Sequence, residues 1–238
     1  MSKYVLSDCG VYVAEYDLSG DHNAISLTES GAVLDATTFG CSTRVNAGGL
    51  SDIALTGEGY WESGSGDLDA ALNDVLMVHD ELITIAPQTT DAGDAAKFFK
   101  SLTSTYTPMT GSVGELLKFN IGASGRSVLA NGNILANEKV TVTGNGTAYE
   151  LGAVGAAEYL YGGVHVTAFD GTSIGLTIES DDNESFTSAT TRITFTIASD
   201  VTAEWATPVS GAITDTWWRA TWTVVGTSMD VVFVMAIQ

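Results

Sequence analysis

The stretch SDDNESF, residues 180–186, is the best candidate for a metal site in the sequence. Asp181, Asp182, Asn183 and Glu184 offer carboxylate and amide oxygens, the ligands that Ca²⁺ prefers. The stretch lacks the alternating D-x-[DN]-x-[DN]-G spacing of an EF-hand loop. A solvated turn between two strands explains the same residues, so calcium binding competes here with a plain structural role.

Residue types that carry catalysis are present but scattered. The histidines His22, His79 and His165 show no i, i+4 metal spacing, and neither Cys9 nor Cys41 sits at a zinc-ribbon interval. No G-x-S-x-G nucleophile elbow occurs. A Cys9–Cys41 disulfide is allowed by count, but two reduced thiols are the preferred interpretation. We therefore expect no enzyme, no catalytic residue and no cofactor.

Tryptophans near the end of the chain raise a different chemistry, stacking against sugar rings. Side chains alternate between the faces of a strand, so in DTWWRATW, residues 215–222, one face holds Trp218, Ala220 and Trp222. We expect that set to lie in the core and Trp217, on the other face, to be half exposed. Trp217 is therefore a possible glycan contact.

The elements that position these residues are mainly strands. Valine and threonine are frequent, and alternating segments such as RITFTIA and RATWTVVG are separated by Gly, Asp, Asn and Ser clusters. One segment departs from this pattern, because the apolar residues of 68–77 recur at the i, i+3, i+4, i+7 spacing of a helix face. A further helical turn or two is expected at 94–102, DAAKFFKSL.

The pattern also changes near residues 146–155, where we place a domain boundary. Residues 1–148 read as an antiparallel meander with the one substantial helix. Residues 149–238 read as regular strands without a helix, which indicates a β-sandwich of jelly-roll or Ig-like type.

The charge excludes some partners. The 238 residues carry 29 acidic and 9 basic side chains, a net charge of −20. Such a surface repels nucleic acid and anionic membranes, because affinity for both comes mainly from Lys and Arg. The sequence contains no apolar run of the ~20 residues that a membrane helix needs, and its N-terminus does not resemble a secretory signal. We expect no membrane association.

One stretch favours an assembly role. LDATTFG, residues 34–40, leads into CSTRVNAGGLSD, so two β-like runs flank a polar, Gly-rich segment with a single large apolar side chain, Phe39. No nucleophile, metal cluster or phosphate loop accompanies it. We interpret residues 34–52 as a long hairpin that holds neighbouring copies of the chain.

The order of several short motifs resembles the major tail tube proteins of long-tailed, siphovirus-like bacteriophages. The matching features are DLSG at 17–20, LDATTFG at 34–40, Arg44, GLSD at 49–52, Trp61 and the helix start DLDAAL. The likeness covers roughly residues 10–150, and residues 149–238 look like a β extension found in a subset of phage tail proteins. The family often has an acidic residue where this chain has Cys41, which prevents a charge-based reading of the loop.

The resemblance implies a two-sheet β-barrel or sandwich flanked by one helix, with an outward-facing C-terminal domain. It also implies hexameric rings that stack into a tube, with the hairpin near 34–52 reaching from one ring to the next. The implied subunit-interface residues are Leu34, Asp35, Thr37, Thr38, Phe39, Arg44, Leu50 and Asp52.

The implied partners are other copies of the chain and other tail proteins, namely the tape measure, terminator and distal tail proteins. DNA would pass through the lumen without specific binding. The expected location is the virion tail, assembled in the host cytoplasm. Two other functions remain open from the sequence: a capsid decoration or other virion surface protein, and a glycan-binding module.

Overall fold

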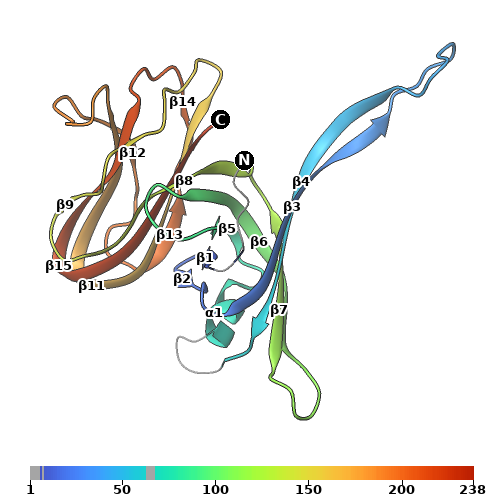
Figure 1. The fold of residues 1–238 in the computed structure, drawn as a ribbon, viewed down its shortest axis with the longest axis horizontal. Coiled ribbons are helices and arrows are strands. Elements are labelled where there is room, and N and C mark those ends of the chain that lie inside the picture. The colour runs from blue at the N-terminus through green and yellow to red at the C-terminus, as the bar shows by residue number, and fades with distance from the viewer. Residues whose placement is uncertain (1–5, 7, 63–67) are drawn as a thin grey trace. The chain divides into compact units, whose positions relative to one another are not determined.

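The computed structural model describes residues 6, 8–62 and 68–238, and these form a mainly-β protein (Figure 1), which confirms the predicted fold class. In this part of the chain the elements are, in order, β1 Gly10–Val13, β2 Tyr16–Asp17, β3 His22–Asp35, β4 Asn46–Tyr60, α1 Leu68–Val75, β5 His79–Ala86, β6 Ala95–Thr110, β7 Lys118–Gly125, β8 Ala130–Val140, β9 Gly144–Asn145, β10 Tyr149–Glu150, β11 Tyr159–Asp181, β12 Thr190–Thr194, β13 Thr202–Trp205, β14 Val209–Ser210 and β15 Trp217–Ile237. No helix among them is long and apolar enough to cross a membrane.

Contacts divide the chain into two compact units. Unit 1 takes the described residues of 1–20, 80–100 and 130–238, and unit 2 takes those of 21–79 and 101–129. The boundary that the sequence predicts near residue 148 lies inside unit 1. This is because β15 pairs with β11 on one side and with β8 on the other, so strands from both sides of residue 148 share one sheet.

Two long strands organise unit 1. β11 and β15 pair in antiparallel fashion along almost their whole lengths, and the ladder shifts register between Val166 and Ser173. Alternate side chains of β15 enter different cores: Phe233 lies in one buried cluster and Val232 and Val234 in another. Both faces of the ladder are thus buried along this part of β15, which explains its run of apolar residues.

Helix α1 confirms the spacing prediction. Its buried residues, Leu68, Ala71, Leu72 and Val75, form one stripe. The helix was predicted to reach residue 77, but it ends at Val75. Met77 takes a left-handed backbone conformation, with φ 63°, and its N–H donates to the Thr103 carbonyl at 2.9 Å.

The helical turn expected at 94–102 is wrong, because these residues belong mainly to strand β6. Phe98 and Phe99 are adjacent and both fully buried. A strand buried on both faces accommodates that pair, whereas one face of a short helix does not. Within unit 1, Ala96 pairs with Gly132 and Phe98 with Ala130 of β8. Tertiary pairing here overrides local helix propensity.

A buried histidine anchors the tight connection between β1 and β2. His165 on β11 is fully buried; its Nδ1–H donates to the Ala14 carbonyl at 2.6 Å and its Nε2 accepts from the Thr84 hydroxyl at 2.8 Å. Ala14 is itself buried and left-handed, with φ 51°. Burial lowers the pKa of His165 to about 4, and the bond to Ala14 only partly opposes this.

Acidification will therefore destabilise unit 1 through His165. Between pH 6.5 and 4, His165 binds a proton in the unfolded chain but stays neutral in the folded protein. The free energy of unfolding that is present above pH 6.5 is therefore lost as the pH falls to about 4. The expected loss is about 3 kcal/mol. Urea unfolding at a series of pH values measures it, with His165→Gln as the comparison. An equal pH slope for both proteins in this window would show that His165 does not titrate as described.

Candidate assembly interface

Unit 2 is built on a sheet with the strand order β3-β4-β7-β6, to which β6 contributes residues 101–110. Directly paired residues of antiparallel strands share a face. One face is apolar and largely covered: Ile25, Leu27, Ile53, Leu55, Phe119, Ile121 and Ala123. The helix joins this region through Asp69, whose carboxylate accepts from the Tyr106 hydroxyl at 2.6 Å and from the Trp61 indole at 3.2 Å.

The opposite face of the same sheet is open and polar. Most of its side chains carry hydroxyl or amide groups, and Leu102, which pairs with Ser124, is a half-buried apolar residue among them: Ala24, Ser26, Ala54, Thr56, Glu58, Leu102, Thr105, Thr107, Lys118, Asn120 and Ser124. Its Lys118 lies 3.7 Å from Glu58, so the two charges offset each other. No core-sized apolar side chain stands on this face between residues 54 and 58 of β4, so the sheet presents a polar surface to solvent.

The hairpin of β3 and β4 runs on beyond this sheet as a two-stranded arm (Figure 1). β4 pairs with β7 only from Ala54 to Tyr60, whereas β3 and β4 remain paired as far as Asp35 and Asn46. The eight residues 46–53 therefore extend the arm by roughly 25 Å, without its loop. Every residue from 28 to 52 is exposed, and we call this segment the arm.

The loop at the end of the arm is organised by its own polar groups. The Thr37 N–H donates to the Asp35 carboxylate at 3.0 Å, and the Val45 N–H donates to the Thr37 hydroxyl at 2.9 Å. Hydrogen bonds from Thr37 hold the pKa of Asp35 below its usual range. Arg44 Nε lies 3.4 Å from Asp35 Oδ2, yet most of the Arg44 side chain is exposed. The loop is thus shaped before any partner arrives.

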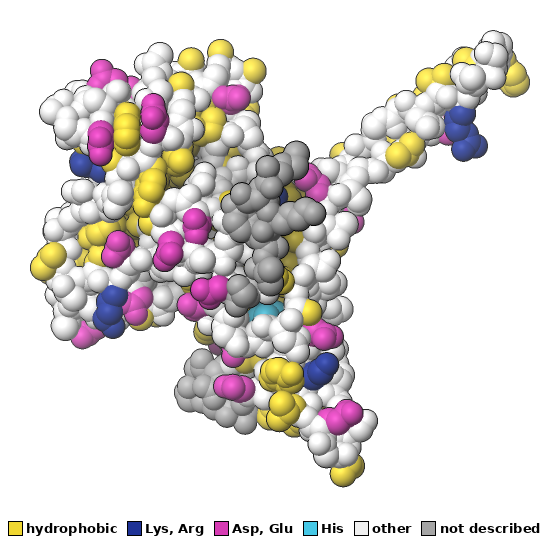
Figure 2. Space-filling model, in the orientation of Figure 1, with side chains coloured by type: hydrophobic (Ala, Val, Ile, Leu, Met, Phe, Trp, Pro, Cys, Tyr) yellow, Lys and Arg dark blue, Asp and Glu magenta, His cyan; other side chains and the backbone are white. Residues whose placement is uncertain are grey.

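The arm also carries apolar side chains that nothing in the described chain covers. Phe39 is fully exposed and Leu50 is 88% exposed; Val33, Leu34 and Val45 are exposed as well. Figure 2 shows hydrophobic atoms gathered along the far part of the arm. Soluble monomers rarely expose apolar groups together in this way, and such groups commonly mark interaction sites.

The eight interface residues predicted from the sequence all lie on the arm and are all exposed. They are Leu34, Asp35, Thr37, Thr38, Phe39, Arg44, Leu50 and Asp52. The structure brings Asp35, Thr37 and Arg44 into one polar cluster and leaves Phe39 and Leu50 outside it. Their contact with another subunit stays a prediction.

Sequence reasoning missed a second exposed apolar segment, the connection between β6 and β7. We call residues 109–117 the tip. Met109, Val113, Leu116 and Leu117 are exposed there. Beside the tip is a surface hollow of about 410 Å³, whose lining includes Tyr60, Glu115 and Leu116. The signal in the sequence was the apolar content of GSVGELL, residues 111–117, because a polar turn does not need Val113, Leu116 and Leu117.

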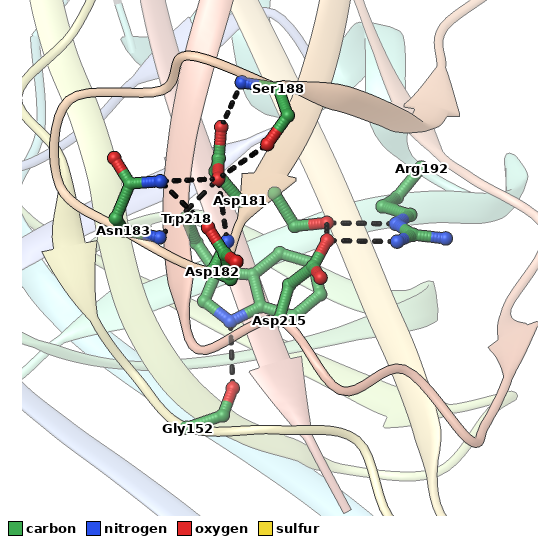
Figure 3. Close-up of polar contacts among 9 residues, drawn as sticks. Gly152, Asp181, Asp182, Asn183, Ser188, Arg192, Asp215 and Trp218 are labelled. Carbon is green, nitrogen blue, oxygen red and sulfur yellow. Dashed lines mark hydrogen bonds and ion pairs between the residues drawn. The ribbon is translucent and has the colours of Figure 1, made fainter.

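The metal candidate at 180–186 is a loop held by hydrogen bonds to one buried carboxylate (Figure 3). Asp181 is almost fully buried. It accepts from the N–H groups of Asp182 at 2.7 Å, Asn183 at 3.3 Å and Ser188 at 2.7 Å. The Asn183 amide at 3.0 Å and the Ser188 hydroxyl at 3.2 Å donate to it as well. Burial alone would raise the pKa of Asp181, but these donors together lower it.

Charged neighbours reinforce that loop. Arg192 donates to the Ser180 hydroxyl at 2.7 Å and pairs with Asp215 at 2.8 Å, and the Ser180 hydroxyl also donates to Asp215 at 2.6 Å. Hydrogen bonds from Ser180 and Arg192 keep the pKa of Asp215 low. Within the described chain, no three His, Cys, Asp or Glu side chains come together as metal ligands. The hydrogen bonds to Asp181 explain its burial, because its carboxylate fixes the backbone of the loop between residues 181 and 188.

The tryptophans divide as the strand pattern predicts. Trp218, Ala220 and Trp222 are buried in one core, and the Trp218 indole donates to the Gly152 carbonyl at 2.8 Å. Trp217 is partly exposed and pairs in register with Glu150 and Asp181. Its role as a glycan contact stays a prediction.

Both cysteines are free thiols. Cys41 is exposed on the arm beside the Thr38 hydroxyl, whose hydrogen bond lowers the pKa of the thiol. Burial raises the pKa of Cys9, and Asp8 adds to this effect. Cys41 is therefore the more reactive thiol.

No protein-family description matches the sequence, and no curated protein matches it. Solved structures with similar folds include one titled as the virion of a native gene transfer agent particle, which is 12% identical with a TM-score of 0.41 over 52% of this chain and 95% of that chain. Another is the sheath–tube complex of an extracellular contractile injection system, PVC, in its extended state. It is 13% identical, with a TM-score of 0.44, and the match covers 55% of this chain and 92% of that chain. A third is SPP1 Dit, described as a paradigm of the hub adsorption apparatus in phages that infect Gram-positive hosts. It is 9% identical, with a TM-score of 0.39, and the match covers 98% of this chain and 100% of that chain. Similarity at this level does not establish a family or a function.

Proposed function

We propose that the protein is a structural subunit of a phage tail tube, assembled as hexameric rings that stack head to tail. The observation that carries the proposal is the construction of unit 2. A single sheet offers one open polar face and extends into an arm whose apolar residues have no cover in the described chain. A subunit that never assembled would gain nothing from either feature.

The polar face suits the wall of a conduit for DNA. Hydroxyl and amide side chains keep the surface of such a wall hydrated. The charges of Glu58 and Lys118 cancel, so this pair adds no net positive charge to the wall. The chain as a whole carries −20, so phosphates find few cations to bind. DNA would pass along this surface as cargo without specific recognition.

Ring closure has a candidate in strand β3. Among the described strands β3 pairs only with β4, so its outer edge is available to a strand of another copy. Exposed strand edges promote aggregation unless they are blocked or paired, and closing a ring would pair them. The arm would then contact the adjacent ring, and tape measure, terminator and distal tail proteins would meet the ends of the tube.

Gold-labelled antibody against the protein, applied to the intact particle, tests this location. Regular labelling along the tail, with a bare capsid, is the expected result. Labelling confined to the capsid would contradict the tail proposal and favour a decoration protein. An antibody to the major capsid protein serves as the positive control for capsid access.

A further inference from the structure

We propose that the arm of one copy docks on the tip of the next copy, with Phe39 against the hollow beside Tyr60 and Leu116 and with Arg44 facing Glu115. The inference rests on the proposed function and names the acceptor surface within it. The docking partner is a second copy of this chain, displaced along the stacking direction of the tube.

The two surfaces lie at opposite ends of one sheet. Tyr60 of β4 pairs with Lys118 of β7, so the tip follows at the Tyr60 end. The arm leaves the same strand at the other end, past Asn46. In Figure 1 the arm and the β6–β7 connection accordingly point away from each other. Stacking copies along the strand direction brings the arm of one subunit to the tip of its neighbour and leaves a free arm to continue.

Both ends of the sheet carry exposed apolar groups. The arm offers the exposed ring of Phe39 with Leu34 and Leu50, and the tip offers Leu116 and Val113. The hollow of about 410 Å³ beside the tip is walled by Tyr60 and Leu116 and provides a place for an aromatic ring. Burying these groups together would remove two exposed apolar surfaces in one contact.

The charges at the two ends are also complementary. Arg44 is the only Lys or Arg in residues 21–60, and Glu115 is the only charged residue of the tip. The Arg44 side chain is 76% exposed. Glu115 lines the hollow together with Lys118, whose positive charge is offset by Glu58 at 3.7 Å. Glu115 accepts a long 3.3 Å bond from the Ser112 N–H, which leaves acceptor capacity for a guanidinium. Opposite charges of this kind fix orientation and register at an interface.

A disulfide experiment tests the contact directly. In a Cys9→Ser background, Leu116→Cys places a new thiol on the tip, opposite the native Cys41 of the arm. Mild oxidation of assembled protein is expected to give a ladder of covalent oligomers on a non-reducing gel. A head-to-tail contact links every copy to the next, whereas an arm-to-arm contact stops at dimers. Adding Cys41→Ser must abolish the ladder.

Charge reversal provides the second readout. Arg44→Glu alone and Glu115→Arg alone should each raise the critical concentration for polymerisation about tenfold, and the double variant should restore it to within about threefold. Val142→Ser, an exposed apolar residue of unit 1, is the control and should have no effect.

The outcomes separate the two proposals. A ladder that needs both thiols, together with rescue by the double variant, supports the docking contact. Polymers that form normally without a ladder or a charge effect overturn this contact and leave the tube function intact. Dimers alone also overturn it. Absence of any polymer from the unmodified protein, with or without tail components, overturns both.

Discussion

Replacing residues 31–51 with Asn-Gly will abolish polymerisation and leave a folded monomer. Ser30 and Asp52 pair directly across the hairpin, so a two-residue turn can join β3 to β4 at that point. The deleted residues are all exposed and contribute nothing to either core. The loss removes Phe39, Arg44 and Leu50, and with them every arm contact that the stack would use.

Sedimentation velocity and electron microscopy measure the polymer, and thermal unfolding measures the monomer. The melting temperature should change by less than about 3 °C, because surface changes away from a core are nearly neutral. The control is Val142→Ser, which should polymerise like the unmodified protein. Normal tubes from the shortened protein would contradict the role of the arm in assembly. An unfolded product would contradict the claim that the folded cores do not depend on the arm.

Replacing Asp181 with Asn will lower the melting temperature by on the order of 10 °C. The carboxylate is almost fully buried and accepts from three backbone N–H groups, so an amide of the same shape would turn an NH₂ group toward some of these donors. A buried donor left without an acceptor is costly, and several are affected here. We expect the loop of residues 181–188 to open.

Asp182→Asn is the matched control, because Asp182 is exposed and its carboxylate accepts only from the neighbouring Asn183 amide at 2.6 Å among the contacts described. It should melt within about 2 °C of the unmodified protein. Adding calcium or a chelator separates the two interpretations of this loop. If calcium raised the melting temperature of the unmodified protein but not of Asp181→Asn, Asp181 would be a metal ligand and not only an organiser.

Local patterns predicted the elements whose neighbours lie close in sequence. The helix at 68–75 follows from its apolar stripe, and the buried positions of Trp218 and Trp222 follow from strand alternation. The hairpin around 34–52 was also visible, because its two strands pair with each other across a short loop. In each case the signal and the contact that satisfies it lie within one short stretch.

Non-local pairing decided what the sequence could not show. Local alternation does not show that residues 159–181 form one continuous strand, β11. Gly171 lies opposite Gly226, so close that a Cβ at 226 would come within 2.3 Å of the Gly171 Cα. The strand at 95–110 depends on β8 and β7, which follow it in the chain. The tip was missed because exposure of Leu116 becomes evident only once the sheet is placed.

The most direct test of the tail-tube assignment is electron microscopy of the purified protein over a range of concentrations. We predict stacked rings around a central channel, with density for the polar face of unit 2 toward the channel and the arm bridging adjacent rings. Closed particles without a channel, or monomers at every concentration even when tail components are added, would contradict the tail-tube assignment.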